Sequence, residues 1–162
     1  MAEKSGAASA AVIEPEQLRQ HWQGHRKLTR RMIEAFPDKE LFEYSIGGMR
    51  TFAQLVSEFL SMGVPTLIGV TSRKWPESDW GTKATTKAEL LQKWDESTAE
   101  IDRLWKEIPA SRFQEEDTAF TQWKMPIYGL LLYVIDNEIH HRGQGYVYLR
   151  SLGIEPPPFY ER

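Results

Sequence analysis

Four segments of the chain repeat apolar residues at every third or fourth position, which is the period of an α-helix. The first segment covers residues 15–36 and begins with Pro15, which is tolerated in the first helical turn because its missing N–H would be unpaired there. Pro37 predicts the end of this helix. One face of the segment carries Leu18, Trp22, His25, Leu28, Met32 and Phe36.

The second helical segment begins at a capping box. Thr51 and Gln54 have the spacing at which two side chains bond the first free backbone N–H groups of a helix. Gly63 and Pro65 predict that this helix ends or kinks, with residues 66–71 as a further turn. Its apolar face consists of Phe52, Leu55, Phe59 and Met62.

The last two helical segments are bounded by proline and glycine. The third covers residues 87–107 and is ended by Pro109, while the fourth runs from residue 126 to residue 152 and is stopped by Gly153. The fourth starts with an apolar stripe through Ile127, Leu130, Leu131 and Val134.

The connections between these helices are long. Residues 38–50 read as a long loop and residues 72–87 as a polar connection. Residues 111–125 leave short strands or a hairpin open, but they alternate too weakly for strands to be assigned. The sequence therefore predicts an all-α protein, a four-helix bundle with long crossover connections. Residues 1–11 are expected to form a disordered tail, and residues 12–162 a single domain.

Composition excludes several functions. The net charge is −3, so no basic field is available for nucleic acid, and Arg26, Lys27, Arg30 and Arg31 are expected to form a solvated helix face. There is no cysteine, which excludes disulfides, thiolate ligands and a cysteine nucleophile. The apolar runs are shorter than a membrane span, and the first residues lack the apolar core of a signal peptide. We therefore expect a cytoplasmic protein without nucleic-acid or membrane partners.

A dense polar cluster follows the apolar stripe of the fourth helix, at residues 136–144. Polar groups at the end of a buried helix cost stability unless each finds a partner. The stripe predicts that Asn137 and His141, four residues apart, point at the bundle centre. Glu138 is expected on the edge of that face, and His140 on a flank together with Arg142. Gly143 and Gly145 suggest the close approach of another helix.

The run His-His-Arg-Gly-Gln at residues 140–144 resembles the last helix of the DinB-like (DinB/YfiT) superfamily. Leu-Arg at 149–150, Gly153 and the Pro-Pro pair at 156–157 continue the resemblance, and residues 45–55 resemble that family's entry to its second helix. The resemblance covers most of residues 14–158 and implies a four-helix bundle.

The resemblance also implies a divalent metal held by three histidines. Carried onto this sequence, the three positions are Glu58, Asn137 and His141, so one position keeps histidine. Glutamate is a competent ligand for Zn, Ni, Mn or Fe, whereas a neutral asparagine is a poor one. Glu58, His141 and Glu138 would make a two-carboxylate, one-histidine site. Alternatively, Glu58 holds His141 protonated and no metal binds.

A second histidine pair lies on the first helix, where His21 and His25 are four residues apart. Such a pair is a possible metal clamp, but the alternative is a hydrogen-bonded core histidine at position 25 with His21 at the rim. We regard His25, together with Glu138 and His140, as possible additional pocket residues.

Two functions follow from these observations. The resemblance implies a metal-dependent transferase that acts with a small thiol, using a polar pocket between the second and fourth helices. The alternative is a metal-free bundle that binds a small molecule without catalysis, or a dimeric structural bundle. We predict a homodimer in either case, because the chain is rich in aromatic residues and Tyr146, Tyr148 and Arg150 have interface composition.

Overall fold

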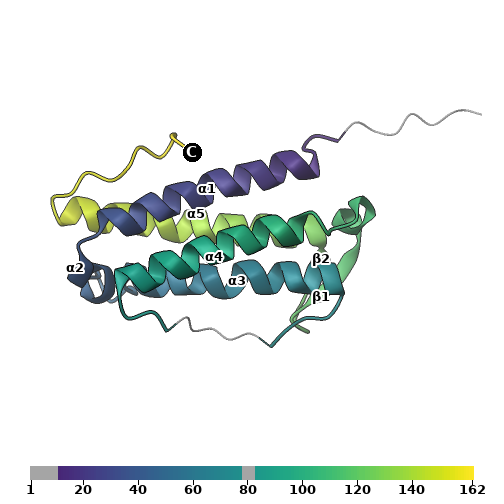
Figure 1. The fold of residues 1–162 in the computed structure, drawn as a ribbon, viewed down its shortest axis with the longest axis horizontal. Coiled ribbons are helices and arrows are strands. Elements are labelled where there is room, and N and C mark those ends of the chain that lie inside the picture. The colour runs from purple at the N-terminus through teal and green to yellow at the C-terminus, as the bar shows by residue number, and fades with distance from the viewer. Residues whose placement is uncertain (1–10, 78–82) are drawn as a thin grey trace, which may run out of the picture.

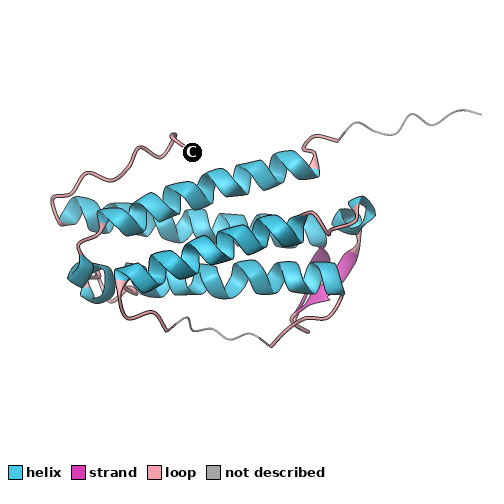
Figure 2. Ribbon diagram, in the orientation of Figure 1, coloured by secondary structure: helices cyan, strands magenta, loops and turns pink. Residues whose placement is uncertain are grey.

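The computed structural model describes residues 11–77 and 83–162, so most of the tail predicted at residues 1–11 lies outside the described residues. Helices account for most of this part of the chain (Figure 2). The four long helices are α1 (Pro15–Ala35), α3 (Phe52–Ser72), α4 (Lys87–Trp105) and α5 (Ile127–Ser151). They correspond to the four segments predicted from the apolar period, and the all-α prediction is confirmed.

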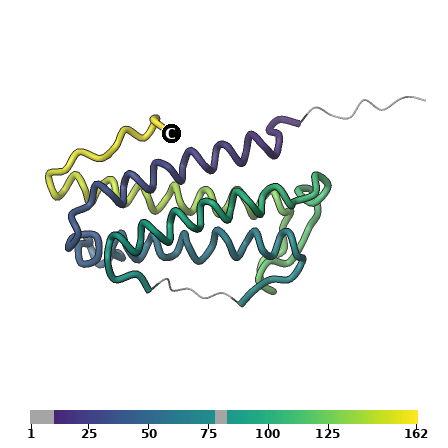
Figure 3. Tube along the Cα trace, in the orientation of Figure 1, coloured from purple at the N-terminus to yellow at the C-terminus, as the bar shows by residue number. Residues whose placement is uncertain are grey.

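The four long helices form a closed bundle in which each contacts two others. α1 packs on α4 and α5, and α3 packs on the same two helices from the other side. Figure 1 shows that α3 and α4 run in one direction and that α1 and α5 run in the opposite one. The connection between α3 and α4 must therefore return along the bundle, as the long crossover predicted. The connection between α4 and α5 stays at one end (Figure 3).

The helix starts follow the local sequence signals. Thr51 accepts a hydrogen bond from the Gln54 backbone N–H, and the Gln54 side chain accepts one from the Thr51 N–H, so the predicted capping box is present. α4 has the same arrangement with Thr86 and Glu89. At the end of α5, Gly153 has φ of +75°, a conformation that glycine adopts without strain.

Three local predictions need correction. Residues 38–50 contain a short helix, α2 (Asp38–Glu43), because Leu41 is buried in the core and Pro37 caps the start. α3 continues through Pro65 to Ser72, since buried residues on both sides of the proline hold the helix in place. Residues 110–126 form a 3-10 turn (Ala110–Gln114) and an antiparallel hairpin of β1 (Glu116–Ala119) and β2 (Trp123–Pro126).

The core forms two apolar clusters along the bundle axis. α3 is long and apolar enough to cross a membrane by composition, with a mean hydropathy of 1.3 over its most apolar window. However, 56% of that window is buried inside the bundle, as in the core helix of a globular protein. The position of α3 in the core therefore accounts for its apolar character.

The two glycines of α5 have different surroundings. A Cβ at Gly145 would lie 2.5 Å from Cε2 of the buried Phe52, so the predicted close approach is present there. Gly143 has no heavy atom within 4 Å of such a Cβ, and the close approach predicted at this position is wrong. Gly143 is exposed, because its side of α5 faces away from the neighbouring helices.

These surroundings predict opposite effects of alanine at the two positions. Gly145→Ala should destabilise the fold by about 1–3 kcal/mol, because Phe52 is packed and cannot move freely. Gly143→Ala should stabilise it by up to about 1 kcal/mol, since alanine favours the helix. Urea denaturation of both variants measures the two changes, and equal effects would contradict the described packing.

Candidate functional site

Glu58, Asn137 and His141 lie together between α3 and α5, as the sequence predicted. Asn137 Nδ2 donates to Glu58 Oε1 at 3.0 Å, and His141 Nε2 lies 3.4 Å from the same oxygen. Asn137 also lies 3.1 Å from Met62 Sδ. All three side chains are partly buried, so the cluster sits at the edge of the core and remains reachable from solvent.

Arg50 is a fourth member of this cluster that sequence reasoning missed. Its guanidinium forms an ion pair with Glu58 Oε2, and Nη2 lies 3.5 Å from His141 Nε2. The backbone of Arg50 is fixed because the buried Tyr148 donates its hydroxyl hydrogen to the Arg50 carbonyl at 2.9 Å. Arg50 directly precedes the capping box, and this position alone does not reveal that its side chain reaches Glu58.

The charges in the cluster follow from these contacts. Burial raises the pKa of Glu58, but the hydrogen bonds from Arg50 and Asn137 outweigh it, so the pKa lies below its ordinary value. Burial lowers the pKa of His141 by more than Glu58 raises it. The balance of these effects favours the neutral imidazole, and the alternative in which Glu58 holds His141 protonated stays a prediction.

This arrangement does not fit a divalent metal. The Arg50 guanidinium bonds one carboxylate oxygen of Glu58 and sits beside the imidazole nitrogen that a metal would use. Asn137 directs an amide N–H, not an oxygen, at Glu58. Glu138, the other carboxylate of the predicted site, points elsewhere. No group of three or more His, Asp or Glu side chains placed to hold a metal occurs in residues 11–77 and 83–162.

The pair at the bundle centre is Glu138 and Arg142, not Asn137 and His141. Their exposed fractions are 2% and 5%, so the predicted rotation of α5 is wrong. Glu138 accepts hydrogen bonds from Thr29 Oγ1 at 2.5 Å and from Trp22 Nε1 at 3.3 Å. The partners on α1 make this burial possible, because a buried carboxylate needs donors for its oxygens.

Two buried arginines complete this central network. Arg26 Nη1 lies 4.0 Å from Glu138, and its remaining N–H groups bond Thr98 on α4 and the Trp94 carbonyl. Arg142 lies 3.7 Å from Glu138. Arg26 is 1% exposed, so the prediction that it belongs to a solvated face is wrong. Arg26 lies four residues after the buried Trp22 and therefore on the same face of α1, and this spacing indicates burial.

The remaining histidines separate into a buried one and two exposed ones. His25 is a core histidine whose Nδ1 accepts from Arg142 Nη2 at 2.8 Å, as the structural alternative predicted. His21 is exposed at its rim, with the two Nε2 atoms 3.2 Å apart. His140 is exposed on the flank, where it was expected, and its ring touches His141.

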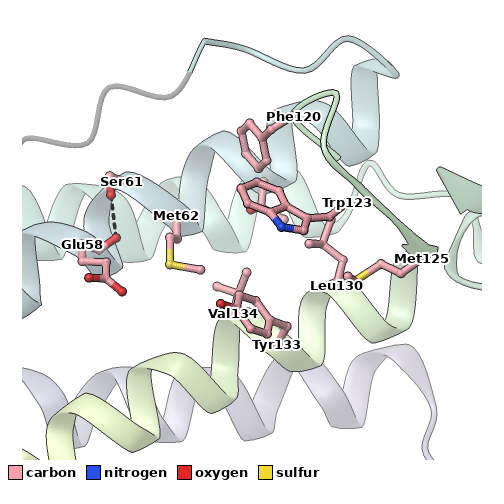
Figure 4. Close-up of a pocket in the computed structure, with 10 residues that line it drawn as sticks. Glu58, Ser61, Met62, Phe120, Trp123, Met125, Leu130, Tyr133 and Val134 are labelled. Atoms are coloured by element: carbon pink, nitrogen blue, oxygen red, sulfur yellow. Dashed lines mark hydrogen bonds between the residues drawn. The ribbon is translucent and has the colours of Figure 1, made fainter. Parts of the chain in front are cut away.

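An apolar cavity of about 380 Å³ begins beside Glu58 and extends to the hairpin. Figure 4 shows it bordered by the two long helices and the hairpin, with Met62 between Glu58 and the aromatic end. Its walls are Glu58, Ser61, Met62 and Thr66 of α3, Leu130, Tyr133 and Val134 of α5, and Phe120, Trp123 and Met125 of the hairpin. The hairpin, which the sequence pattern left open without assigning strands, thus closes one end of the cavity.

The sequence and the fold are both similar to those of known proteins. The sequence model of the DinB family matches residues 1–162. The chain belongs to the DinB family. Among solved structures, it is similar to a DinB-like protein from Bacillus cereus, with 22% identity, a TM-score of 0.72, and coverage of 90% of this chain and 97% of that one.

A DinB-like protein from Bacillus subtilis is similar to the same degree, with 22% identity, a TM-score of 0.72, and coverage of 90% and 98%. At this identity, the likeness concerns the fold alone. No curated protein matches the chain. Membership of the DinB family therefore confirms the resemblance and the bundle, while the chemistry of this member depends on its own residues.

The surface expected to form a dimer in this DinB family member is partly buried. Tyr148 is fully buried, with its ring against that of Tyr44. Tyr146 is half-buried, and its hydroxyl donates to the Pro157 carbonyl at 2.7 Å. The choice of Tyr148 as an interface residue is wrong, because the rotation of α5 turns it inward. The homodimer itself stays a prediction.

Proposed function

We propose that this chain binds a small organic molecule in the cavity between α3, α5 and the hairpin, with Glu58 at its polar end. The observation that carries the proposal is a cavity of about 380 Å³ with apolar walls and Glu58 as the charged residue of its lining. Small-molecule sites usually have this form, with roughly 300–1,000 Å³ and few polar groups. The function requires no metal.

The walls also indicate the chemistry of the ligand. Arg50 pairs with Oε2 of the ionised Glu58 carboxylate and Asn137 donates to Oε1. Each carboxylate oxygen has a second lone pair, so a hydrogen-bond donor of the ligand, such as an amine, would share Glu58 with these two residues. Trp123 and Tyr133 stand at the rim, 42% and 57% exposed, and aromatic faces attract cations. Met62 and Met125 are flexible and adapt to different shapes. We therefore expect an apolar or aromatic body that carries an amine.

Phenethylamine, phenethyl alcohol and hydrocinnamate have similar bodies and different head groups, and they test this function. Phenethylamine should bind most tightly, with chemical-shift changes at the Trp123 indole N–H. Glu58→Gln keeps the shape of the side chain and should weaken amine binding by about tenfold, the lower limit for a charged hydrogen bond at a partly exposed group. Titration followed by NMR measures each dissociation constant.

Two neighbouring histidines supply a matched control. His141→Ala removes a group beside the Glu58 carboxylate and should lower the affinity for phenethylamine, whereas His140→Ala changes an exposed residue and should leave it unchanged. Equal affinities of the natural protein and Glu58→Gln for the amine would refute the proposal. The proposal would also be refuted if His141→Ala and His140→Ala lost the same affinity for phenethylamine, and if that loss only followed their loss of thermal stability.

A metal-dependent transferase acting with a small thiol, as the family resemblance implies, is the second candidate. The observation in its favour is the 3.4 Å separation of Glu58 Oε1 and His141 Nε2, two atoms that are able to share an ion. Arg50 would have to leave both groups before an ion is bound. We therefore derive no reaction step through a metal, and its binding to the natural chain should be weak.

We also propose that the protein forms a homodimer. Several large apolar side chains are exposed at the start of α5 and in the segment that precedes α1, and they suit such a contact better than Tyr148. These residues are Val12, Ile13, Tyr128 and Leu132.

A further inference from the structure

A second cavity, separate from the one beside Glu58, lies beneath the C-terminal segment. After α5 the chain turns back and runs along α1 and α5, as the yellow end of the tube in Figure 3 shows. The space that it covers measures about 730 Å³ and is open to solvent. Its polar lining includes His21, His25, Arg142, Arg150 and Arg162.

Contacts on both helices hold the C-terminal segment over this cavity. The Tyr146 hydroxyl donates to the Pro157 carbonyl at 2.7 Å, and Arg31 Nη1 donates to the Glu161 carbonyl at 3.2 Å. Arg162 also lies close to α1, since a Cβ on Gly24 would be 3.2 Å from the Arg162 Cβ. The segment therefore places the Arg162 side chain at a defined point of the cavity.

Hydrogen-bond donors converge in this cavity without an acceptor to match them. Arg142 Nη2 lies 2.8 Å from Nδ1 of His25, and Arg162 Nη1 lies 2.8 Å from its Nε2. A neutral imidazole has one N–H and one lone pair, so it accepts a hydrogen bond from only one of the two guanidinium groups. Arg142 is the buried one, and it also bonds the His25 carbonyl and Thr29.

We therefore assign the lone pair of His25 to Nδ1 and the hydrogen to Nε2. This hydrogen points towards His21 Nε2, 3.2 Å away, and the Arg162 guanidinium then faces an N–H group. Arg162 has no carboxylate within ion-pair distance in residues 11–77 and 83–162, and the same holds for Arg150. Two guanidinium groups thus reach the cavity without a counter-charge.

The charged lining of the cavity is more basic than acidic. Three arginines line it, of which Arg142 is paired with Glu138, and Glu155 is the one acidic residue of the lining. The pKa of His25 falls to about 3, chiefly because of burial and also because of the nearby guanidinium groups of Arg142 and Arg162. Guanidinium groups without an ion-pair partner beside an imidazole N–H are features that bind an oxyanion.

We propose that this cavity binds a small organic anion whose carboxylate or phosphate group accepts hydrogen bonds from Arg162 and shares the Nε2 hydrogen of His25 with His21 Nε2. Such an acceptor, beside both donors, takes the Arg162 hydrogen that the imidazole N–H cannot accept. The apolar part of the ligand would contact Ile139, Pro156 and Phe159, which line the same cavity. This site is independent of the proposed amine site, and it has the opposite charge preference.

Titration of the full chain, labelled with nitrogen-15 in histidine, tests this proposal at constant ionic strength. Benzoate and phenyl phosphate should each shift the His25 ring resonances and saturate, whereas phenethylamine should not. The probe that binds more tightly shows whether the cavity prefers a carboxylate or a phosphate group. Arg162→Gln should weaken anion binding by about tenfold or more, because a charge-assisted hydrogen bond is lost. Arg150→Gln should have a smaller effect.

Arg103→Gln is the matched control, because Arg103 is exposed on α4 and pairs with Glu100 and Glu107 away from the cavity. Its affinity for both anions should equal that of the natural chain. The proposal is overturned if neither anion shifts His25 at millimolar concentrations, or if Arg162→Gln and Arg103→Gln bind them equally. A failure of the amine site leaves these outcomes unchanged, because Glu58 does not border this cavity.

Discussion

Glu138→Ala is expected to destabilise the fold by about 3–5 kcal/mol, the usual cost of removing one partner from a buried ionic group. Glu138 is the carboxylate between two buried arginines, at 4.0 Å from Arg26 and 3.7 Å from Arg142. Burial lowers the pKa of Arg26 to about 10, so this residue keeps its charge at neutral pH. Without Glu138, both positive charges would remain in the core without a counter-charge.

Urea denaturation followed by circular dichroism measures this loss. Glu138→Gln keeps the volume and one acceptor oxygen, so it should cost less than Glu138→Ala and remain foldable if the alanine variant does not. Asp136→Ala changes an exposed carboxylate of the same helix and should stay within about 0.5 kcal/mol of the natural protein. Losses below about 1 kcal/mol for both Glu138 variants would show that the arginines do not depend on this charge.

The helices were predictable because their signals are local. Apolar period, capping boxes and terminal prolines all act within a few residues, and they placed α1, α3, α4 and α5 close to their observed bounds. α2 was not predicted, and the hairpin was an open alternative that the weak alternation of residues 111–125 did not settle, since each is stabilised by packing against distant helices. The predicted end of the second helix at Pro65 was wrong for the same reason. Core contacts on both sides of the proline outweigh the cost of a proline within the helix.

The rotation of α5 was predicted incorrectly because one helix does not reveal the partners of its charged residues. Charged side chains are rarely buried without a partner, so the sequence favoured the less charged pair, Asn137 and His141, for the centre. The donors that let Glu138 occupy the centre come from Thr29 and Trp22 on α1. This pairing across more than a hundred residues has no local signature.

The Glu58 cluster was partly predictable. The family resemblance identified Glu58, Asn137 and His141, and the structure brings these three together. The contribution of Arg50 was hidden, because it precedes the helix and the direction of its side chain does not follow from the helical period. Eight residues separate Arg50 and Glu58, about two helical turns, which is compatible with their contact but does not predict it.

Asn137→His is expected to convert the Glu58 cluster into a metal site. The introduced imidazole would stand one turn before His141 on the same side of α5 and opposite Glu58, giving two imidazoles and a carboxylate. It would also replace the amide that now donates to Glu58. Changes outside the ligand shell alter metal affinity by about 10–100-fold, so a new direct ligand should tighten Zn²⁺ or Ni²⁺ binding at least tenfold.

Calorimetric titration of tag-free protein with Zn²⁺ and Ni²⁺ measures this gain. Asp136→His places the same imidazole on the exposed side of α5 and should leave the affinity at the weak level of the natural chain. Adding Arg50→Ala to Asn137→His should tighten binding further, because the guanidinium that competes for Glu58 is removed. If the natural chain already binds one ion per molecule as tightly as Asn137→His, Arg50 does not block the cluster. The transferase candidate would then take precedence over the metal-free site.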